Sequence, residues 1–304
     1  MRLRKSSQIA VVFLLLAQLG WAAAAQDNRQ AVQKEVQPQV QTAKQQAIAK
    51  KKEEAVKDAL DAVLATRAAL SALEQGKTKE ALAHLEIANG KLTLLVARYP
   101  DLGLIPIDSD ALVIDFQGDL KAIKKAVDEA EDLLDDGKVQ DARALLTPLA
   151  SEIRITTTHL PLAIYPEIIK KVAPLIDQGK IDAAKQTLNE ALNTLVVTES
   201  VIPLPVLRAE AMLNKAATAA KAKAPEEQEV LRYLDNAMYQ LRIAQALGYG
   251  DIDKDYKGLY KAIKELEKKI KRRQWGERID RAMEELRKAL GELRVRIGEP
   301  HPTK

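Results

Sequence analysis

Three segments of the chain repeat one pattern around a Gly-Lys pair, and this pattern constrains the fold more than any other feature. Segments 73–92, 134–153 and 176–195 align on it without gaps. Each has Ala five and Leu nine residues after the glycine, then small or apolar residues at positions twelve and sixteen. Because steps of 4, 3 and 4 residues keep one helical face, and apolar residues also precede each glycine, we predict helix, turn and helix in every segment.

The predicted turn residues are Gly76, Gly137 and Gly179. A glycine after a helix adopts the left-handed conformation at little steric cost, and the lysine that follows lies near the carbonyl end of the helix, where positive charge is favourable. The 61 and 42 residues between these glycines differ, whereas a solenoid keeps its period. We therefore expect a compact array of antiparallel helical hairpins.

Gly76-Lys77-Thr78 also matches the end of a phosphate-binding loop. Such a loop needs a glycine five residues before its Gly-Lys and a strand in front of it. Ser71 stands at that position before Gly76, Leu85 stands there before Gly90-Lys91, and the preceding sequence has a helical pattern. We expect no phosphate site at either pair.

Composition supports an all-α fold class, because Ala, Leu, Lys and Glu dominate and aromatic residues make up only 4%. Pro-rich connectors follow the second helix of each hairpin. Two of them, 111–116 and 153–158, are rich in β-branched residues, which suit extended chain. The sequence leaves open whether they pair as a few short strands.

The N-terminus has the pattern of a cleaved signal peptide over residues 1–25. Three basic residues precede the apolar run 9–16, and Ala23, Ala24 and Ala25 offer a cleavage site before Gln26. A membrane anchor is less favoured, since a spanning helix needs about 20 apolar residues. We expect a periplasmic protein, secreted across the inner membrane.

Removal of the signal takes away three of the 47 basic residues and none of the 43 acidic ones, so the net charge falls close to zero. That balance argues against nucleic acid as a partner. The chain has no cysteine, which excludes disulfides and thiol chemistry. The expected organisation is a signal peptide (1–25), a polar N-terminal segment (26–52), a helical-hairpin domain (53–215), a helical extension (216–256) and a basic C-terminal helical hairpin (257–304).

The C-terminal hairpin carries two narrow apolar stripes. The stripes comprise Leu259, Ile263, Leu266 and Ile270, then Ile279, Met283, Leu286, Leu290, Leu293 and Ile297. Narrow stripes suit helices packed on each other or on a second copy, so we expect this hairpin to lie outside the main core and to be dispensable for folding. Its tip is basic and could contact an anionic surface through Lys268, Lys269, Lys271, Arg272 and Arg273.

Three segments together resemble the YfdX family, namely 89–108, 151–166 and 194–210, with the Gly-Lys units between them. The resemblance extends over about residues 50–215. It implies an exported, mostly helical protein associated with bacterial stress responses, acid stress among them. The family has no established catalytic residues, so the resemblance implies no catalytic site.

Few residues suggest chemistry. His159 lies in the Thr-rich connector and Asp108 and Asp110 follow Pro106, so these three are the candidate ligand-binding residues, with Asp115 nearby. The three histidines lack metal spacing, and segment 251–262 begins like a calcium loop but lacks its glycine and final glutamate. We expect no metal and no cofactor. A hydrolase that uses the two aspartates and His159 is the least favoured hypothesis.

The favoured hypothesis is a non-enzymatic periplasmic stress protein of the YfdX type that binds proteins or small ligands in a chaperone-like role. The alternative is an envelope-associated scaffold whose basic C-terminal hairpin contacts anionic lipid or cell wall. The sequence leaves open a homo-oligomer and peripheral membrane contact.

Overall fold

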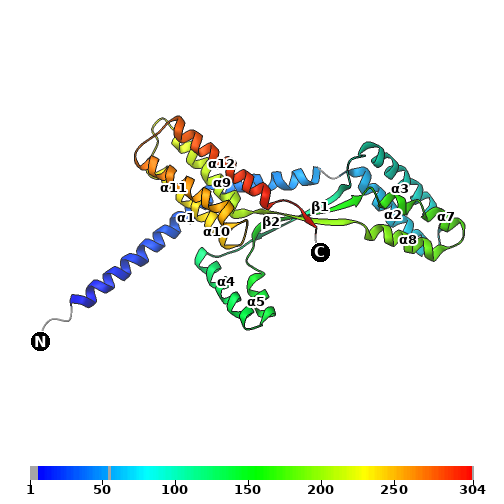
Figure 1. Cartoon of the computed structure of the whole chain (residues 1–304), viewed down its shortest axis with the longest axis horizontal. Helices are drawn as coiled ribbons and strands as arrows, with labels where there is room; N and C mark the ends of the chain where they lie inside the picture. The colour runs from blue at the N-terminus through cyan, green and yellow to red at the C-terminus, as the bar shows by residue number, and fades with distance from the viewer. Residues whose placement is uncertain (1–5, 54–55, 303–304) are drawn as a thin grey trace. The chain divides into compact units, whose positions relative to one another are not determined.

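The computed structural model describes residues 6–53 and 56–302 (Figure 1). Part of the predicted signal peptide, residues 1–5, lies outside them, and its cleavage remains a prediction. The chain forms two compact units. Unit 1 comprises the described residues of segments 1–43, 114–152 and 202–297. Unit 2 comprises those of segments 44–113, 153–201 and 298–304.

Helices make up most of the described chain, which confirms the predicted all-α class. Those of unit 1 are α1 (Ser6–Glu53, which continues into unit 2), α4 (Leu120–Asp135), α5 (Val139–Leu146), α9 (Leu204–Ala220), α10 (Glu227–Ala246), the π-helical turn η1 (Ile252–Tyr256), α11 (Lys257–Lys271) and α12 (Glu277–Ile297). Those of unit 2 are α2 (Lys57–Glu74), α3 (Thr78–Arg98), α6 (Tyr165–Ile169), α7 (Val172–Asp177) and α8 (Ile181–Asn193).

The connectors pair as strands, which decides the question that the sequence left open. The sheet has the order β1 (Leu104–Asp115), β2 (Ser151–Pro161), β3 (Val196–Pro203) and β4 (His301–Pro302). Glu199 pairs with His301 in the antiparallel contact of β3 and β4. Ile105, Ile107, Ile153 and Ile155 are all buried, which is the alternation of a strand with one covered face. Three of the limits between the units fall within β1, β2 and β3.

The three repeated glycines have the left-handed conformation that the turn interpretation requires. Their φ angles are 74°, 75° and 72° for Gly76, Gly137 and Gly179. At the first turn, Lys77 N donates to Ala72 O at 2.9 Å and Gly76 N donates to Leu73 O at 3.1 Å. This pair of bonds is the Schellman motif, which satisfies the last carbonyl groups of the helix. The same pair recurs at the other two turns.

Unit 2 buries the repeated face of its hairpins. Ala81, Leu85, Ala88 and Leu92 of α3 are at most 1% exposed, and the equivalent Ala184, Leu188 and Ala191 of α8 are fully buried. Alanine at these positions lets neighbouring helices approach closely. The second repeat differs, because Leu146 of α5 stays 41% exposed although it is equivalent to Leu85 and Leu188.

Unit 1 has its own core, and the C-terminal hairpin belongs to it. All ten predicted stripe residues of α11 and α12 except Ile297 are buried, in one cluster with α9, α10 and three valines of α1, namely Val32, Val36 and Val40. Arg294 of α12 also pairs with Glu210 of α9 at 3.0 Å. The expectation that this hairpin lies outside the main core is therefore wrong.

The physical reason is that α9 is apolar around most of its circumference. Eleven of its 17 residues are buried, so a single neighbouring helix cannot cover it. A narrow stripe on α12 suffices because α10 covers another side of α9. The predicted boundary between 215 and 216 also falls inside α9, and the predicted domain 53–215 contributes to both units. Within the described residues, no helix is both long enough and apolar enough to cross a membrane.

The turn geometry predicts opposite effects for two glycine-to-alanine changes in the α2–α3 hairpin. Gly76→Ala forces a side chain into positive φ and should lower the free energy of unfolding by roughly 1 kcal/mol. Gly90→Ala, in the middle of α3 with open space around its Cα, should raise it by roughly 0.5–1 kcal/mol. Urea unfolding of both variants measures the difference. Equal shifts of the same sign would contradict the turn assignment.

Candidate ligand-binding groove

Unit 1 contains a groove of about 1040 Å³ that is lined from several segments of the chain. Residues 26–37, in the middle of α1, line one side of it, and α9 and α10 contribute to the rest of the lining. Residues 115–119, between β1 and α4, close one end together with the first residue of β2. Its volume is at the upper end of the range for small-molecule sites.

The segment between β1 and α4 is shaped by a close contact. A Cβ atom on Gly118 would lie 2.4 Å from the ring of Phe116, so only glycine lets this ring occupy its position at the groove. Asp119 then caps α4, because its Oδ1 accepts a hydrogen bond from Ala122 N at 2.8 Å. The turn therefore places Phe116 in the wall and starts a helix directly after it.

A charged network holds Asp115 in place at this end of the groove. Arg208 of α9 is only 7% exposed and donates to Asp115 Oδ2 at 2.6 Å. Ser151 Oγ donates to the other carboxylate oxygen at 2.7 Å, and Ser151 N donates to Tyr249 Oη at 2.9 Å. Tyr249 in turn donates to Glu152 at 2.7 Å. The carboxylate of Asp115 is thus engaged on both oxygens.

Three buried polar atoms in the groove lining lack hydrogen-bond partners among the described residues. They are Arg29 Nε, Arg208 Nε and Gln240 Oε1. A buried polar group without a partner costs about 1–3 kcal/mol, so such atoms are unusual in a part of the protein that serves only packing. A small rearrangement around a bound guest would let these groups form hydrogen bonds.

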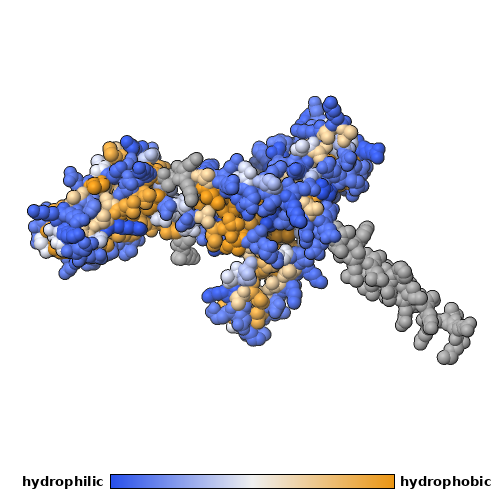
Figure 2. All heavy atoms as spheres, turned by 180° about the vertical axis from the view of Figure 1, so that it is seen from behind, coloured by the Kyte–Doolittle hydropathy of each residue, from blue (hydrophilic) through white to orange (hydrophobic). Residues whose placement is uncertain are grey.

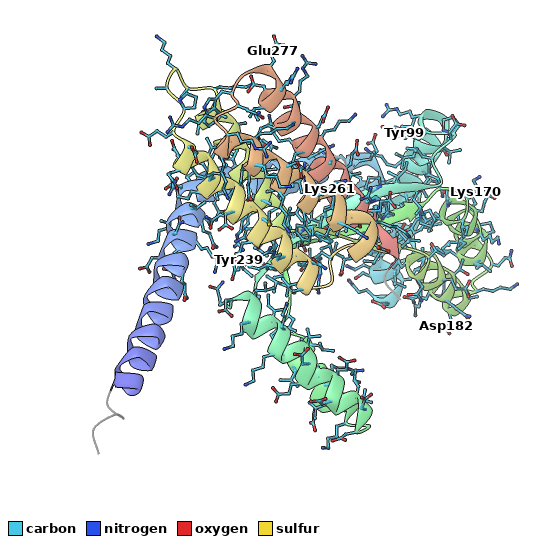
Figure 3. The ribbon with its side chains drawn as sticks, turned by 60° about the vertical axis from the view of Figure 1, so that its left-hand side comes forward. Tyr99, Lys170, Asp182, Tyr239, Lys261 and Glu277 are labelled. Atoms are coloured by element: carbon cyan, nitrogen blue, oxygen red, sulfur yellow. The ribbon has the colours of Figure 1, made fainter. Side chains whose placement is uncertain are left out.

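Arg29 and Tyr239 bring α1, α4 and α10 together at the groove. The guanidinium of Arg29 lies 4.0 Å from the centre of the Tyr239 ring, which is a cation–π contact. Tyr239 Oη accepts a hydrogen bond from Leu120 N at 3.3 Å, and Figure 3 shows Tyr239 beside the start of α4. Tyr239 therefore contacts a cation through its ring and the start of α4 through its hydroxyl.

The charge of the lining favours anions. Arg29, Lys34 and Arg208 stand against Asp115 and Asp119. Both carboxylates already accept hydrogen bonds within the protein, whereas the Nε groups of the two arginines do not donate to any described residue. A carboxylate, sulfonate or phosphate next to Phe116 or Tyr239 would suit this chemistry.

The predicted ligand-binding residues lie elsewhere, on the strands of unit 2. Gly103 O accepts from Leu162 N at 3.1 Å, and the Ser109 and Thr157 hydroxyls lie 3.0 Å apart, so β1 and β2 run antiparallel. Strand alternation places the exposed Asp108 and Asp110 on one face, and His159 on the other face with Thr157. The strands do not bring the two aspartates and His159 together.

Arg208, Gln240 and Arg29 were not predicted from the sequence. Arg208 did carry a signal, since it is a single arginine in the otherwise apolar run Leu204–Leu213 apart from Glu210. An arginine in such a helix needs a buried anion. That anion is Asp115, which in the sequence is only one of a group of aspartates after Pro106.

The other predicted features have structural partners. Asp251 and Asp255 of the calcium-like segment contact other protein groups. Asp255 Oδ2 accepts a hydrogen bond from Asp251 N at 2.7 Å, and Asp255 forms an ion pair with Arg296. In the described residues, no group of three His, Cys, Asp or Glu side chains could hold a metal ion. The basic tip is mostly exposed, with Lys268 paired to Glu265 at 2.7 Å.

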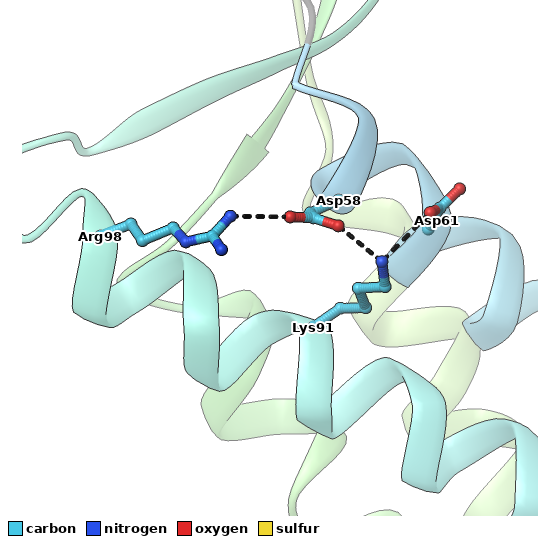
Figure 4. Close-up of polar contacts among 4 residues, drawn as sticks. All are labelled: Asp58, Asp61, Lys91 and Arg98. Carbon is cyan, nitrogen blue, oxygen red and sulfur yellow. Dashed lines mark hydrogen bonds and ion pairs between the residues drawn. The ribbon is translucent and has the colours of Figure 1, made fainter.

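Lys91, of the second Gly-Lys pair, joins two helices of unit 2 (Figure 4). Its ammonium contacts Asp58 Oδ1 at 2.5 Å and Asp61 Oδ2 at 3.3 Å, and Arg98 reaches the other oxygen of Asp58 at 3.1 Å. The hydrogen bond from Lys91 lowers the pKa of Asp58 below its ordinary value, and the same bond raises the pKa of Lys91. This lysine therefore links α2 to α3.

Comparison with known proteins agrees with the resemblance over the hairpin region. Residues 62–201 match the family model described as YfdX protein. Among solved structures, the chain is similar to a structure of Salmonella Typhi YfdX, with 17% sequence identity and a TM-score of 0.36. That alignment covers 49% of this chain and 93% of the other. No curated protein matches the chain.

The lowered pKa of Asp58 predicts a pH-dependent contribution to stability. A carboxylate whose folded-state pKa lies below its unfolded value stabilises the protein above the unfolded pKa, and this contribution is lost as the pH falls through the folded pKa. Asp58→Asn should therefore lower the melting temperature at pH 7, and this difference from wild type should shrink below about pH 4. Thermal melting at pH 7, 5 and 3 tests it. Asp101→Asn, at an exposed position of unit 2, is the control, and a difference that is constant with pH would contradict the prediction.

Proposed function

We propose that the protein is a non-enzymatic, periplasmic and stress-associated binding protein of the YfdX type, a proposal that the match of residues 62–201 to the YfdX family model supports. The groove of unit 1 is its ligand site under this proposal. Periplasmic location draws on the signal-peptide pattern of residues 1–25, and the stress role draws on the family resemblance.

The observation that carries the proposal is the set of unpartnered buried atoms of Arg29, Arg208 and Gln240 around one groove. Packing alone gives no reason to leave a guanidinium donor and an amide acceptor unbonded in one lining. A small anionic ligand with an apolar or aromatic part would engage the cations and lie against Phe116 and Tyr239. The groove combines residues from inside and outside the range 62–201, so this site is a property of the whole chain.

Chaperone-like binding of proteins is the second form of the same proposal. Several large apolar side chains of unit 2 are exposed, among them Leu64 (49%), Ile87 (51%) and Leu94 (49%). Figure 2 shows apolar areas on the space-filling surface. Exposed apolar side chains on helices can hold extended or unfolded segments of other proteins.

We expect the double change Arg29→Gln and Lys34→Gln to weaken binding of a small aromatic anion by about tenfold, because a hydrogen bond to a charged group contributes about 1.5–3 kcal/mol. The probe is anilinonaphthalene sulfonate, followed by fluorescence titration. Lys264→Gln, on an exposed part of α11, is the control and should leave the affinity unchanged.

Native mass spectrometry of the protein from a periplasmic extract identifies the natural guest. Equal affinity of the double variant and wild type would contradict the groove as the site. If the chaperone-like form holds instead, both proteins will suppress light scattering from a denatured client equally, and Ile87→Lys with Leu94→Lys will reduce that suppression. No binding in either assay would overturn the proposal.

The alternative is an envelope-associated scaffold that contacts anionic lipid or cell wall through the basic tip. Lys268 and Lys271 in the last turn of α11, and Arg272 and Arg273 directly after it, are exposed, which favours this hypothesis. Because α11 and α12 are part of the core of unit 1, single-residue changes test it better than a truncation.

Lys271→Gln with Arg272→Gln should weaken binding to phosphatidylglycerol vesicles if the scaffold hypothesis holds. Each basic residue near an anionic bilayer contributes about 1 kcal/mol, and salt screens the attraction within about 8 Å at physiological ionic strength. Co-sedimentation at low and physiological salt measures it, with Lys79→Gln and Lys180→Gln in unit 2 as the control. Binding that neither salt nor the double change reduces would exclude the basic tip as the contact.

A further inference from the structure

The α4–α5 hairpin of unit 1 has four apolar side chains that the rest of the described chain leaves more than a third exposed. Val127 (37% exposed) and Leu134 (48%) lie on α4, and Val139 (49%) and Leu146 (41%) lie on α5. The hairpin extends from the rest of unit 1 in Figure 1, and Figure 2 shows apolar colouring along it. We name these four side chains the hairpin face.

The hairpin face extends along both helices. The turn at Gly137 makes α4 and α5 antiparallel, so Leu134 and Val139 flank the turn. Val127 and Leu146 each lie about two helical turns further from it. On α4, the face continues the stripe of the buried Ile123 and Ala130, with steps of 4, 3 and 4 residues. This spacing is typical of a helix that packs along a seam with other helices.

The charges of α4 run against its own helix dipole. Lys121, Lys124 and Lys125 occupy its first turns, and Glu131, Asp132 and Asp135 occupy its last turns. A helix dipole favours the opposite order, and a lysine that precedes an acidic residue by four positions is the weaker orientation of such a pair. The Asp119 cap is the one acidic group at the start of α4 in the described residues, and no ion pair among them involves any of the three lysines.

A second copy of the same helix would compensate this order of charges. When two α4 helices pack antiparallel about a twofold axis, the basic end of each lies beside the acidic end of the other, and the two dipoles also oppose each other. The same packing buries both copies of the hairpin face. The apolar stripe and the charge order therefore fit one partner, which is this chain itself.

We propose that the α4–α5 hairpin is a self-association surface, on which two copies pack as an antiparallel four-helix bundle. Lys121 and Lys124 of each copy face Glu131 and Asp135 of the other. The contact is small, so we expect dimerisation at micromolar concentrations and sensitivity to salt. The surface is separate from the groove, and the proposal does not depend on what the groove binds.

Two charge-reversal variants test the pairing. Variant A carries Lys121→Glu and Lys124→Glu, and variant B carries Glu131→Lys and Asp135→Lys. Each alone places like charges together, so its dimer dissociation constant should rise about tenfold or more over wild type. A mixture of A and B should restore dimers, because the acidic copy then faces the basic one. Sedimentation equilibrium of the full chain measures all four samples, with Lys79→Glu on α3 as the control.

Because the chain has no cysteine, a single introduced one gives a second measurement. Val127→Cys lies near the proposed axis and should form a disulfide-linked dimer on mild oxidation, whereas Lys79→Cys should stay monomeric. A wild type that stays monomeric at concentrations far above the micromolar range, which would leave the face to another protein or to lipid, overturns the proposal. Dimers that neither variant weakens, or a mixture of A and B that does not associate, overturn it as well.

Discussion

The ion pair between Arg208 and Asp115 is the interaction on which the arrangement of unit 1 depends. Arg208 is buried in α9, a helix with eleven of its 17 residues buried, and a buried charge without a counterion is strongly unfavourable. Asp115 must therefore lie beside α9, which fixes the end of β1 there. Ser151, at the start of β2, is held by a hydrogen bond from its hydroxyl to the same carboxylate. Tyr249 is held in turn by a hydrogen bond from Ser151 N to its hydroxyl. One charge thus determines where two strands leave unit 1 and where the groove forms.

The hairpins could be predicted from the sequence because their signals are local. A glycine at positive φ and apolar residues at helical spacing depend only on neighbours within a few turns. Pairing of the connectors could not be decided, since residues such as Ser109 and Thr157 meet only after two helices intervene. The groove was missed for the same reason, because Arg208 and Asp115 are 93 residues apart. The C-terminal stripes were misjudged because stripe width does not reveal that α9 needs cover on several sides.

The three Gly-Lys units show that one local pattern can serve different packing roles. In unit 2, Leu85 and Leu188 are buried against neighbouring helices, and Lys91 adds an ionic link between α2 and α3. In unit 1, the equivalent Leu146 is exposed, although its turn has the same hydrogen bonds and nearly the same φ angle. The turn chemistry therefore specifies the hairpin, and the environment decides how much of each hairpin is covered.

The way unit 1 is assembled from separate stretches of the chain has a consequence for the order of folding. The hairpin of α2 and α3 is continuous in sequence and can form as soon as residue 98 has been synthesised. The core of unit 1 instead needs Val32 from α1 and Leu293 from α12, so it cannot close until nearly the whole polypeptide has emerged. Until then α9 exposes its apolar sides to water. A chain of this design must therefore be protected, or must emerge quickly, during the interval between α9 and α12.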